Sequence, residues 1–143
     1  MLTYVDTSVL VALCTNEMES VRVDKWYSNC KDELISAVWC ITEFASALSI
    51  KQTTGQINQE LAHQSWEQFK ILCNADINLL SLDPSEYYAA ANMILEKNKG
   101  LRAGDALHLA CAQKQAANNI ATLDKVMAKH AKMLKIKNIF NIS

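Results

Sequence analysis

Four carboxylates in this sequence stand among apolar or small residues and outside any charged surface run. They are Asp6, Glu43, Asp105 and Asp124. Carboxylates that share one pocket repel each other, so either their pKa values rise or a cation holds them together. An all-oxygen cluster is the donor set that Mg²⁺ or Mn²⁺ prefers. Such an ion polarises a phosphodiester and activates a bound water for in-line attack, so this chemistry requires no Ser, Cys or His nucleophile.

The first of these acids follows a predicted N-terminal strand. Residues 3–5 lead into Asp6, and the hydroxyl residues Thr7 and Ser8 then precede a predicted helix over residues 9–13. Either Thr7 or Ser8 is expected to be the N-cap of that helix. In open α/β sheets, ligands bind beyond the carboxyl ends of the strands, where the strand order reverses. Asp6 is therefore predicted to stand where such a sheet does its chemistry.

The other three acids follow later elements in a similar way. Glu43 lies one turn into the helix after the second predicted strand, and Asp124 leaves the carboxyl end of the fourth. Asp105 lies in the first turn of an Ala-rich helix, where Gly104 allows a close backbone approach. All four acids are expected at one rim of the sheet if the first and fourth strands are neighbours. Spacing alone leaves a simpler alternative open, because a helix-terminal Asp is commonly a cap.

Strands alternate with helices along the whole chain. The predicted strands are 3–5, 33–37, 76–82, 119–122 and 138–142. Helices are predicted over residues 9–13, 20–31, 38–51 and 101–118. Three more are predicted from their ends: one begins after an Asn58 cap, one runs from a capping box at Asp83 to Lys97, and one ends near Lys132. This alternation predicts an α/β fold in which helices cover both faces of a parallel sheet.

Composition limits the class of protein further. A length of 143 residues is expected to form a single domain, 1–143, and no segment approaches the length of a membrane span, so a soluble cytoplasmic protein is predicted. The five cysteines form no C-x-x-C pair, which predicts neither a disulfide framework nor a zinc site. The formal net charge is −1. The segment from Lys125 onward nevertheless contains five lysines and no acidic side chain, a pattern typical of a phosphate-binding patch or of a solvated helix face.

Four stretches of the chain resemble, in order, the motifs of PIN-domain ribonucleases, and within that family the VapC-type toxins of bacterial toxin–antitoxin modules. They are Val5-Asp6-Thr7-Ser8-Val9-Leu10, Thr42-Glu43-Phe44, Leu101-Arg102-Ala103-Gly104-Asp105-Ala106-Leu107-His108-Leu109-Ala110 and Ala121-Thr122-Leu123-Asp124. The third stretch is long and specific, whereas the second depends on an isolated Glu. Together they span nearly the whole chain.

The resemblance implies a three-layer α/β/α sandwich and an endoribonuclease that depends on Mg²⁺ or Mn²⁺ and prefers single strands. Asp6 and Asp105 would be the principal metal ligands, Glu43 a ligand or an orienter of water, and Asp124 the support for a second metal. The residues that would hydrogen-bond these carboxylates are Thr7, Ser8 and Thr122. The implied partners are an RNA substrate, a small cognate antitoxin and a second copy of the chain.

Several residues keep two interpretations. Arg102, Lys125 and Lys129 are candidates for contact with RNA or antitoxin, but Arg102 could equally cap the end of the preceding helix near Lys99. His108 lies one turn past Asp105, and a packed histidine with one satisfied nitrogen is favoured over a site residue. The tryptophans Trp26, Trp39 and Trp66 are interpreted as packing residues in preference to base-stacking ones.

Two rival functions remain at this stage. A phosphatase of the haloacid-dehalogenase type would also place an Asp after the first strand, but it needs a second Asp two positions later, where this chain has Ser8. A non-catalytic PIN-like interaction module would use the acids only to shape a binding surface. Neither rival explains four ordered acids as directly as a nuclease does.

Overall fold

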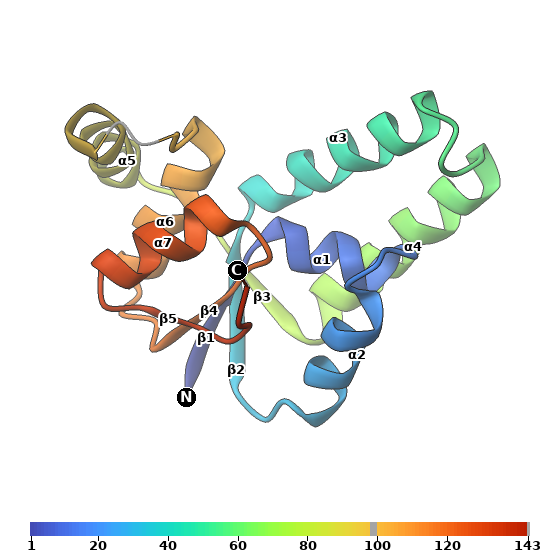
Figure 1. Ribbon diagram of the computed structural model, residues 1–143, viewed down its shortest axis with the longest axis horizontal. Coiled ribbons are helices and arrows are strands. Elements are labelled where there is room, and N and C mark those ends of the chain that lie inside the picture. The colour runs from blue at the N-terminus through green and yellow to red at the C-terminus, as the bar shows by residue number, and fades with distance from the viewer. Residues whose placement is uncertain (98–99, 143) are drawn as a thin grey trace.

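The computed structural model describes residues 1–97 and 100–142, which form a three-layer α/β/α sandwich (Figure 1). The sheet contains strands β1 (Leu2–Val5), β2 (Glu33–Ala37), β3 (Ile77–Leu80), β4 (Asn119–Ala121) and β5 (Lys137–Asn138). The helices of the described residues are α1 (Thr7–Cys14), α2 (Ser20–Asn29), α3 (Trp39–Thr53), α4 (Gln59–Ala75), α5 (Pro84–Lys97), α6 (Ala103–Lys114) and α7 (Lys125–Met133). The predicted fold class is confirmed.

The strand order places the predicted acidic rim at the centre of the sheet. All the strand pairs are parallel, and the order is β3-β2-β1-β4-β5. Val5 is in register with Ala121, and the Asp6 N–H donates to the Ala121 carbonyl at 2.9 Å. The chain builds outward from β1 through β2 to β3 and then returns to the other side of β1. The order therefore reverses between β1 and β4, which are the neighbours that the sequence argument required.

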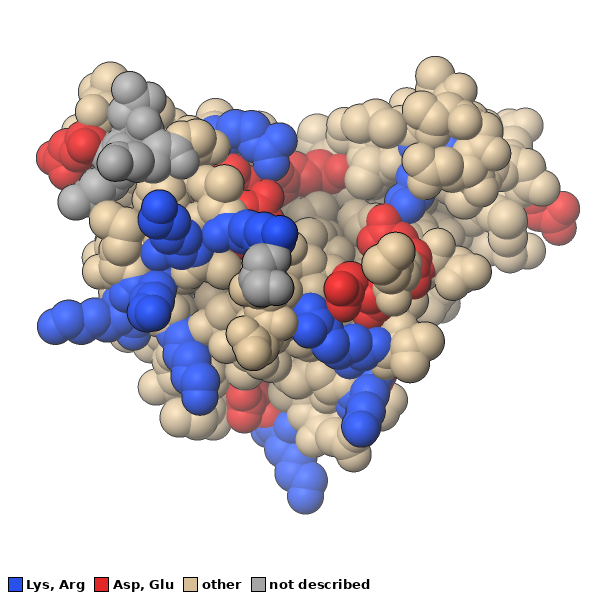
Figure 2. Space-filling model, viewed as in Figure 1, with Lys and Arg blue, Asp and Glu red and all other residues tan. Residues whose placement is uncertain are grey.

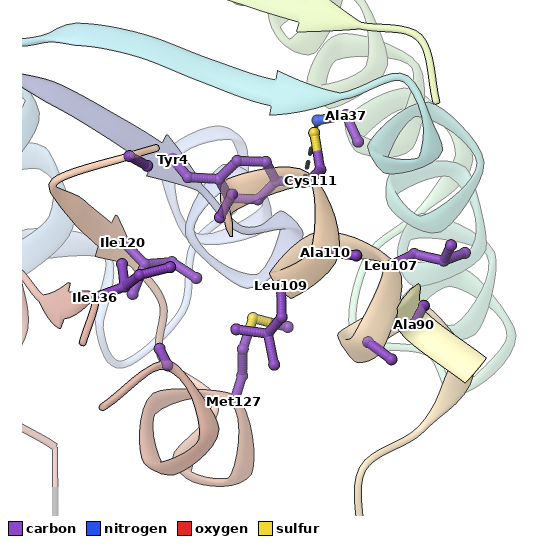
Figure 3. Packing of buried hydrophobic residues seen from close by; sticks show 14 of the residues in the cluster. Tyr4, Ala37, Ala90, Leu107, Leu109, Ala110, Cys111, Ile120, Met127 and Ile136 are labelled. Carbon is purple, nitrogen blue, oxygen red and sulfur yellow. Dashed lines mark hydrogen bonds between the residues drawn. The ribbon is translucent and has the colours of Figure 1, made fainter. Parts of the chain in front are cut away.

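Each face of the sheet has its own hydrophobic core because successive strand residues point to opposite sides. Tyr4 and Ile120 face a cluster formed with α5, α6 and α7, to which Leu109 and Met127 contribute (Figure 3). Val5 faces the opposite cluster, formed with helices α1 to α4. Strands that are buried on both faces hold the loops at their carboxyl ends in fixed positions, and these loops carry the acids.

Some predicted boundaries differ from the structure. Helix α1 begins at Thr7, so Asp6 is its N-cap residue, although the Asp6 side chain makes no capping hydrogen bond. The prediction of Thr7 or Ser8 as N-cap was therefore wrong. The last strand is Lys137–Asn138 and not 138–142, because Phe140 and its neighbours pack into the core as an irregular segment. Within the described part of the chain, no helix is both long and apolar enough to cross a membrane.

Candidate active site

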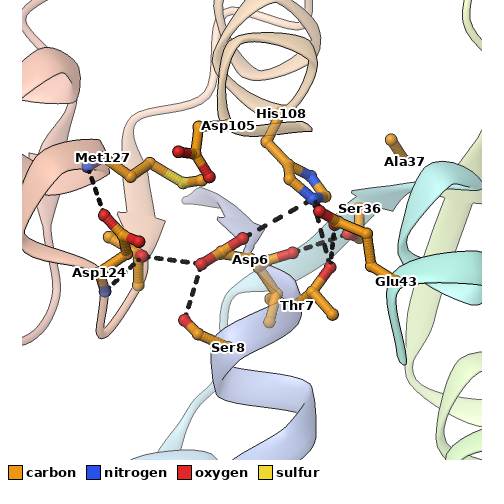
Figure 4. A network of polar contacts seen from close by, with 12 residues as sticks. Asp6, Thr7, Ser8, Ser36, Ala37, Glu43, Asp105, His108, Asp124 and Met127 are labelled. Carbon is orange, nitrogen blue, oxygen red and sulfur yellow. Dashed lines mark hydrogen bonds and ion pairs between the residues drawn. The ribbon is translucent and has the colours of Figure 1, made fainter. Parts of the chain in front are cut away.

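The four acids line one cleft of about 540 Å³ at the carboxyl ends of β1 and β4. Asp6 joins β1 to α1, Glu43 lies on α3, Asp105 lies in the first turn of α6, and Asp124 precedes α7. Figure 4 shows these side chains converging from four separate elements. The sheet topology therefore brings together acids that are up to 118 positions apart in the chain.

Asp6 is held by hydroxyl groups on one side only. Its carboxylate is buried, and Oδ2 accepts hydrogen bonds from Ser8 Oγ at 2.7 Å and from Thr122 Oγ1 at 2.8 Å. The other oxygen, Oδ1, lies 3.7 Å from His108 Nε2. Ser8 and Thr122 thus occupy the supporting positions that the resemblance implied, and they fix the orientation of the Asp6 carboxylate.

Glu43 is fixed through Oε1. Thr7 Oγ1 donates to this oxygen at 2.6 Å, and His108 Nε2 also contacts it. A Cβ at position 104 would lie 2.6 Å from Glu43 Oε2, so any other residue than Gly104 would require the carboxylate to move from its place against α6. Burial acts to raise the pKa of Glu43, but the hydrogen bonds and charge of His108, together with the Thr7 hydrogen bond, outweigh burial and lower it. Glu43 is therefore an ionised and immobilised side chain.

His108 contributes more to this site than its sequence predicted. It is fully buried, as expected, but both ring nitrogens have partners: Nδ1 shares a 2.5 Å hydrogen bond with Tyr4 OH, and Nε2 faces Glu43, Thr7 and Asp6. Because the Thr7 hydroxyl already donates to Glu43, Nε2 must carry a proton that it donates toward these oxygens. The prediction that His108 is packed is therefore confirmed, whereas the prediction that only one of its nitrogens is satisfied was wrong.

The pKa of His108 reflects its acidic surroundings. Burial acts to lower this pKa, but the Glu43 hydrogen bond and the negative charges of Asp6, Glu43 and Asp105 raise it overall. The three-residue spacing between Asp105 and His108 was the one sequence signal of this role, since it places both side chains on the same side of α6. The partner Tyr4, in contrast, comes from β1 and could be identified only from the fold.

Asp105 and Asp124 form the more open side of the cleft, where Arg102 lies between them. Arg102 Nε is 3.4 Å from Asp105 Oδ2, and its Nη2 is 3.4 Å from Asp124 Oδ2. Burial and the negative charge of Asp124 raise the pKa of Asp105, whereas the charge of Asp105 raises the pKa of Arg102. Arg102 is the N-cap residue of α6. The alternative that it caps the preceding helix near Lys99 concerns residues 98–99, which lie outside the described residues.

The donor set of this cleft fits a hard divalent cation. Within residues 1–97 and 100–142, no group of three or more acidic, histidine or cysteine side chains is placed so that together they could hold a metal ion. Mg²⁺ does not need such a group, because it binds through one or two carboxylates and retains several waters. Burial, and after it the negative charge of Asp124, raises the pKa of Asp105, and the guanidinium of Arg102 lies within 3.4 Å of both carboxylates, where a cation would also be attracted.

The remaining candidates lie at different distances from this cleft. Trp39 lines it, whereas Trp66 packs against Phe44 and Phe69 in the core. Trp26 packs edge-on against Phe140, with ring centroids 5.5 Å apart. The packing interpretation therefore describes Trp26 and Trp66, while Trp39 belongs to the wall of the cleft. Lys125 and Lys129 line a separate groove that begins beside Asp124.

The fold and the cleft together define an α/β protein with an acidic site at the switch point of a parallel sheet. A family model described as the PIN domain matches residues 3–133. The chain therefore belongs to the PIN-domain family, a family of nucleases. A search of curated protein sequences finds no match.

Solved structures with the same fold include several bacterial and archaeal proteins. VapC20 of Mycobacterium tuberculosis, described as a toxin that cleaves the sarcin–ricin loop, is 13% identical, with a TM-score of 0.74 over 90% of this chain and 94% of that chain. FitAcB of Neisseria gonorrhoeae is 17% identical, with a TM-score of 0.69 over 97% and 96%. PAE2754 of Pyrobaculum aerophilum is 19% identical, with a TM-score of 0.67 over 97% and 90%. At these low sequence identities, the structural similarity shows that the proteins share a fold and nothing more.

Proposed function

We propose that this protein is a metal-dependent endoribonuclease and the toxin of a type II toxin–antitoxin pair. The observation that carries the proposal is the convergence of four acids on one cleft of a PIN domain. In support of this proposal, the fold is similar to that of VapC20, which is described as a toxin that cleaves the sarcin–ricin loop. We expect the protein to act in the cytoplasm, where both RNA and a newly made antitoxin are present.

Asp6 Oδ1 and the Asp105 carboxylate are the groups that would hold Mg²⁺ or Mn²⁺, with Glu43 and Asp124 beside them. When bound, such an ion polarises a phosphodiester and stabilises the negative charge that develops during hydrolysis. The protein itself supplies orientation: Ser8 and Thr122 direct Asp6, whereas Thr7 and His108 direct Glu43. We therefore assign catalytic roles to the four acids and positioning roles to the residues that hold them.

Arg102 fits a contact with the phosphate being cleaved. Its side chain is 77% exposed, yet its guanidinium stays at the rim of the cleft through Asp105 and Asp124. A guanidinium binds phosphate through paired hydrogen bonds, and the side chain can turn from the carboxylates toward an incoming RNA strand. We infer that Arg102 contacts RNA when substrate is bound.

The proposed antitoxin would bind beside the acids. The cleft extends along α3 over apolar side chains that include Trp39, Ala47 and Ile50, and Ile50 is 60% exposed. A short helix with an apolar face and one basic side chain would cover this surface and neutralise the acids. VapBC2 of Rickettsia felis, a structure of the same fold at 10% identity, is described as bound to DNA from its own promoter, as expected for a paired system (TM-score 0.65, covering 96% of this chain and 97% of that chain). We also expect a homodimer.

The test is RNA cleavage by the purified protein with Mg²⁺ or Mn²⁺, with and without a chelator. Wild type should cleave only with metal, and Asp6→Asn should lose at least about a hundredfold in rate, as when a group that stabilises transition-state charge is removed. The matched control is Asp24→Asn, an exposed acid on α2, which should cleave like wild type. Cleavage that survives both the chelator and Asp6→Asn would contradict the proposal.

The same preparations separate the rival functions. Ser8 donates to Asp6 and has no carboxylate to act as acid or base, so phosphate trapping at Asp6 should fail. A protein that captures an antitoxin but never cleaves RNA with either metal would instead be an interaction module.

A further inference from the structure

The face of α7 that points away from the core forms one wall of a lysine-lined groove. Lys125, Ala128, Lys129 and Lys132 follow a helical spacing on this face, while Met127 and Ala131 on the opposite face are buried. The other wall is the segment that contains β5, and the groove has a volume of about 620 Å³. Figure 2 shows lysine side chains gathered over this part of the molecule.

Among residues 1–97 and 100–142, the lysines of this groove have no acidic partner in an ion pair. Lys51, Lys70 and Lys114 form ion pairs with carboxylates of the protein itself. Among the described residues, no such pair involves the groove lysines, which are Lys125, Lys129, Lys132, Lys135 and Lys137. Like charges at i, i+4 on a helix destabilise it slightly, so this arrangement does not serve the stability of α7. An anionic ligand would relieve the repulsion.

The groove combines a row of lysines with some apolar surface. Ile136 and Phe140 form part of its lining, yet they are only 5% and 6% exposed because they pack into the core. A phosphate backbone needs only positive charge at intervals, which the lysines supply. Chemistry therefore favours a nucleic-acid strand over an antitoxin segment.

The groove and the candidate active site are lined by consecutive residues of the chain. Asp124 lines the acidic cleft and caps α7 through Oδ1, and the next residue, Lys125, lines the groove. From Lys125 to Lys132 the helix rises about 10 Å at 1.5 Å per residue. We infer that the α7–β5 groove binds the phosphate backbone of single-stranded RNA on one side of the bond that is cut. This inference rests on the proposed function.

The test measures RNA binding separately from cleavage. A fluorescein-labelled oligouridylate of about 16 nucleotides is titrated with full-length protein that carries Asp105→Asn, with Mg²⁺ present, across a series of salt concentrations. Adding Lys129→Gln and Lys132→Gln should weaken binding roughly tenfold at 0.1 M salt. It should also reduce the slope of log Kd against log salt by about 1.4, because each lost phosphate contact to a single strand removes about 0.7.

The matched control carries Lys70→Gln and Lys114→Gln in the same background, which removes the same charge from ion-paired lysines on α4 and α6. It should keep the parent slope. Parent-like slopes for the groove variant, or an equal loss in the control, would overturn the inference. An unchanged RNA slope with lost binding of polyglutamate would assign the groove to an acidic protein segment and also overturn it. Absence of RNA binding by the Asp105→Asn parent would count against the proposed function itself.

Discussion

The side chains around the acids of the cleft stabilise the ionised forms of these acids to different extents. Two hydroxyl donors stabilise the negative charge of Asp6, and Thr7 and His108 stabilise that of Glu43. Asp105 has weaker compensation, because Arg102 stands 3.4 Å away while burial and Asp124 oppose its ionisation. The ionised form of Asp105 therefore opposes folding at neutral pH, and it is the acid that a bound cation would relieve most.

We predict that Asp105→Asn stabilises the folded protein while abolishing RNA cleavage. The amide keeps the size of the side chain and can still accept the Arg102 backbone N–H, but it removes the unfavourable charge. Without metal, the melting temperature should rise by about 3 °C, which for a chain of this size is about 1 kcal/mol. Asp24→Asn should change the free energy of unfolding by less than about 0.5 kcal/mol. A lower melting temperature for Asp105→Asn than for wild type would show that the charge is not a source of strain.

At the scale of elements, Asp124 serves both of the roles that its sequence position left open. Its Oδ1 accepts the Met127 N–H at 2.8 Å and caps α7, while its Oδ2 faces Arg102 in the cleft. A helix cap and a site acid are therefore compatible at the end of a strand. Sequence spacing could not decide between them because each role uses a different oxygen of the same carboxylate.

Two substitutions separate these roles of Asp124. Asn keeps the capping oxygen, so Asp124→Asn should stay within about 0.5 kcal/mol of wild type in unfolding free energy, whereas Asp124→Ala should lose about 1 kcal/mol. Chemical denaturation measures both. Both variants should cleave RNA more slowly than wild type, since each removes the charge. Full cleavage by Asp124→Asn would mean that the residue is a cap and not part of the site.

The sequence predicted most elements because local signals and the final structure agree. Glu33–Ala37 and the Asn58 cap were predicted correctly, and Asn58 accepts the Leu61 N–H as expected. The last strand was misplaced because Ile139 and Phe140 are apolar for a reason unrelated to strand pairing: they fill the core beside α1 to α4. Local pattern cannot distinguish these causes of burial.

The site was predictable to the extent that it depends on strand ends. Asp6 and Asp124 follow two strands, so only the neighbour relation of β1 and β4 had to be inferred. The role of His108 was missed because it depends on Tyr4 and Glu43, which reach it from other elements across the sheet. The spacing of Asp105 and His108 along α6 indicated that both side chains lie on the same side of the helix, but it could not indicate the partners that come from β1 and α3.

For the molecule as a whole, the net charge of −1 conceals a separation of charge. Acidic side chains line the cleft, while the lysines of the α7–β5 groove lie next to it. A protein without metal keeps the carboxylates close together, so its stability should depend on which of them are charged. The pH dependence of unfolding therefore reports on the state of the cleft.

Three groups set the direction of this dependence. The lowered pKa of Glu43 gives stability that is present above its ordinary value of 4.5 and is lost as pH falls below it. The raised pKa of His108 gives stability that is present below its ordinary value of 6.5 and is lost as pH rises through the folded value. The raised pKa of Asp105 removes stability once that group ionises at higher pH. Glu43 therefore sets the acid limit of maximal stability, whereas His108 and Asp105 lower stability toward basic pH in the metal-free protein.

We therefore predict that the metal-free protein is most stable between about pH 4.5 and 6.5 and loses stability toward pH 8. Adding Mg²⁺ or Mn²⁺ at pH 8 should restore it, because a ligand at about 100 times its Kd stabilises by about 2.7 kcal/mol. Thermal melts across pH, with chelator and with metal, measure both effects. In His108→Gln the decline above pH 6.5 should weaken, since the amide cannot titrate, while the metal effect should persist through Asp6 and Asp105. A metal-free optimum at pH 8, or a metal effect that survives in the double variant Asp6→Asn/Asp105→Asn, would refute this account of the cleft.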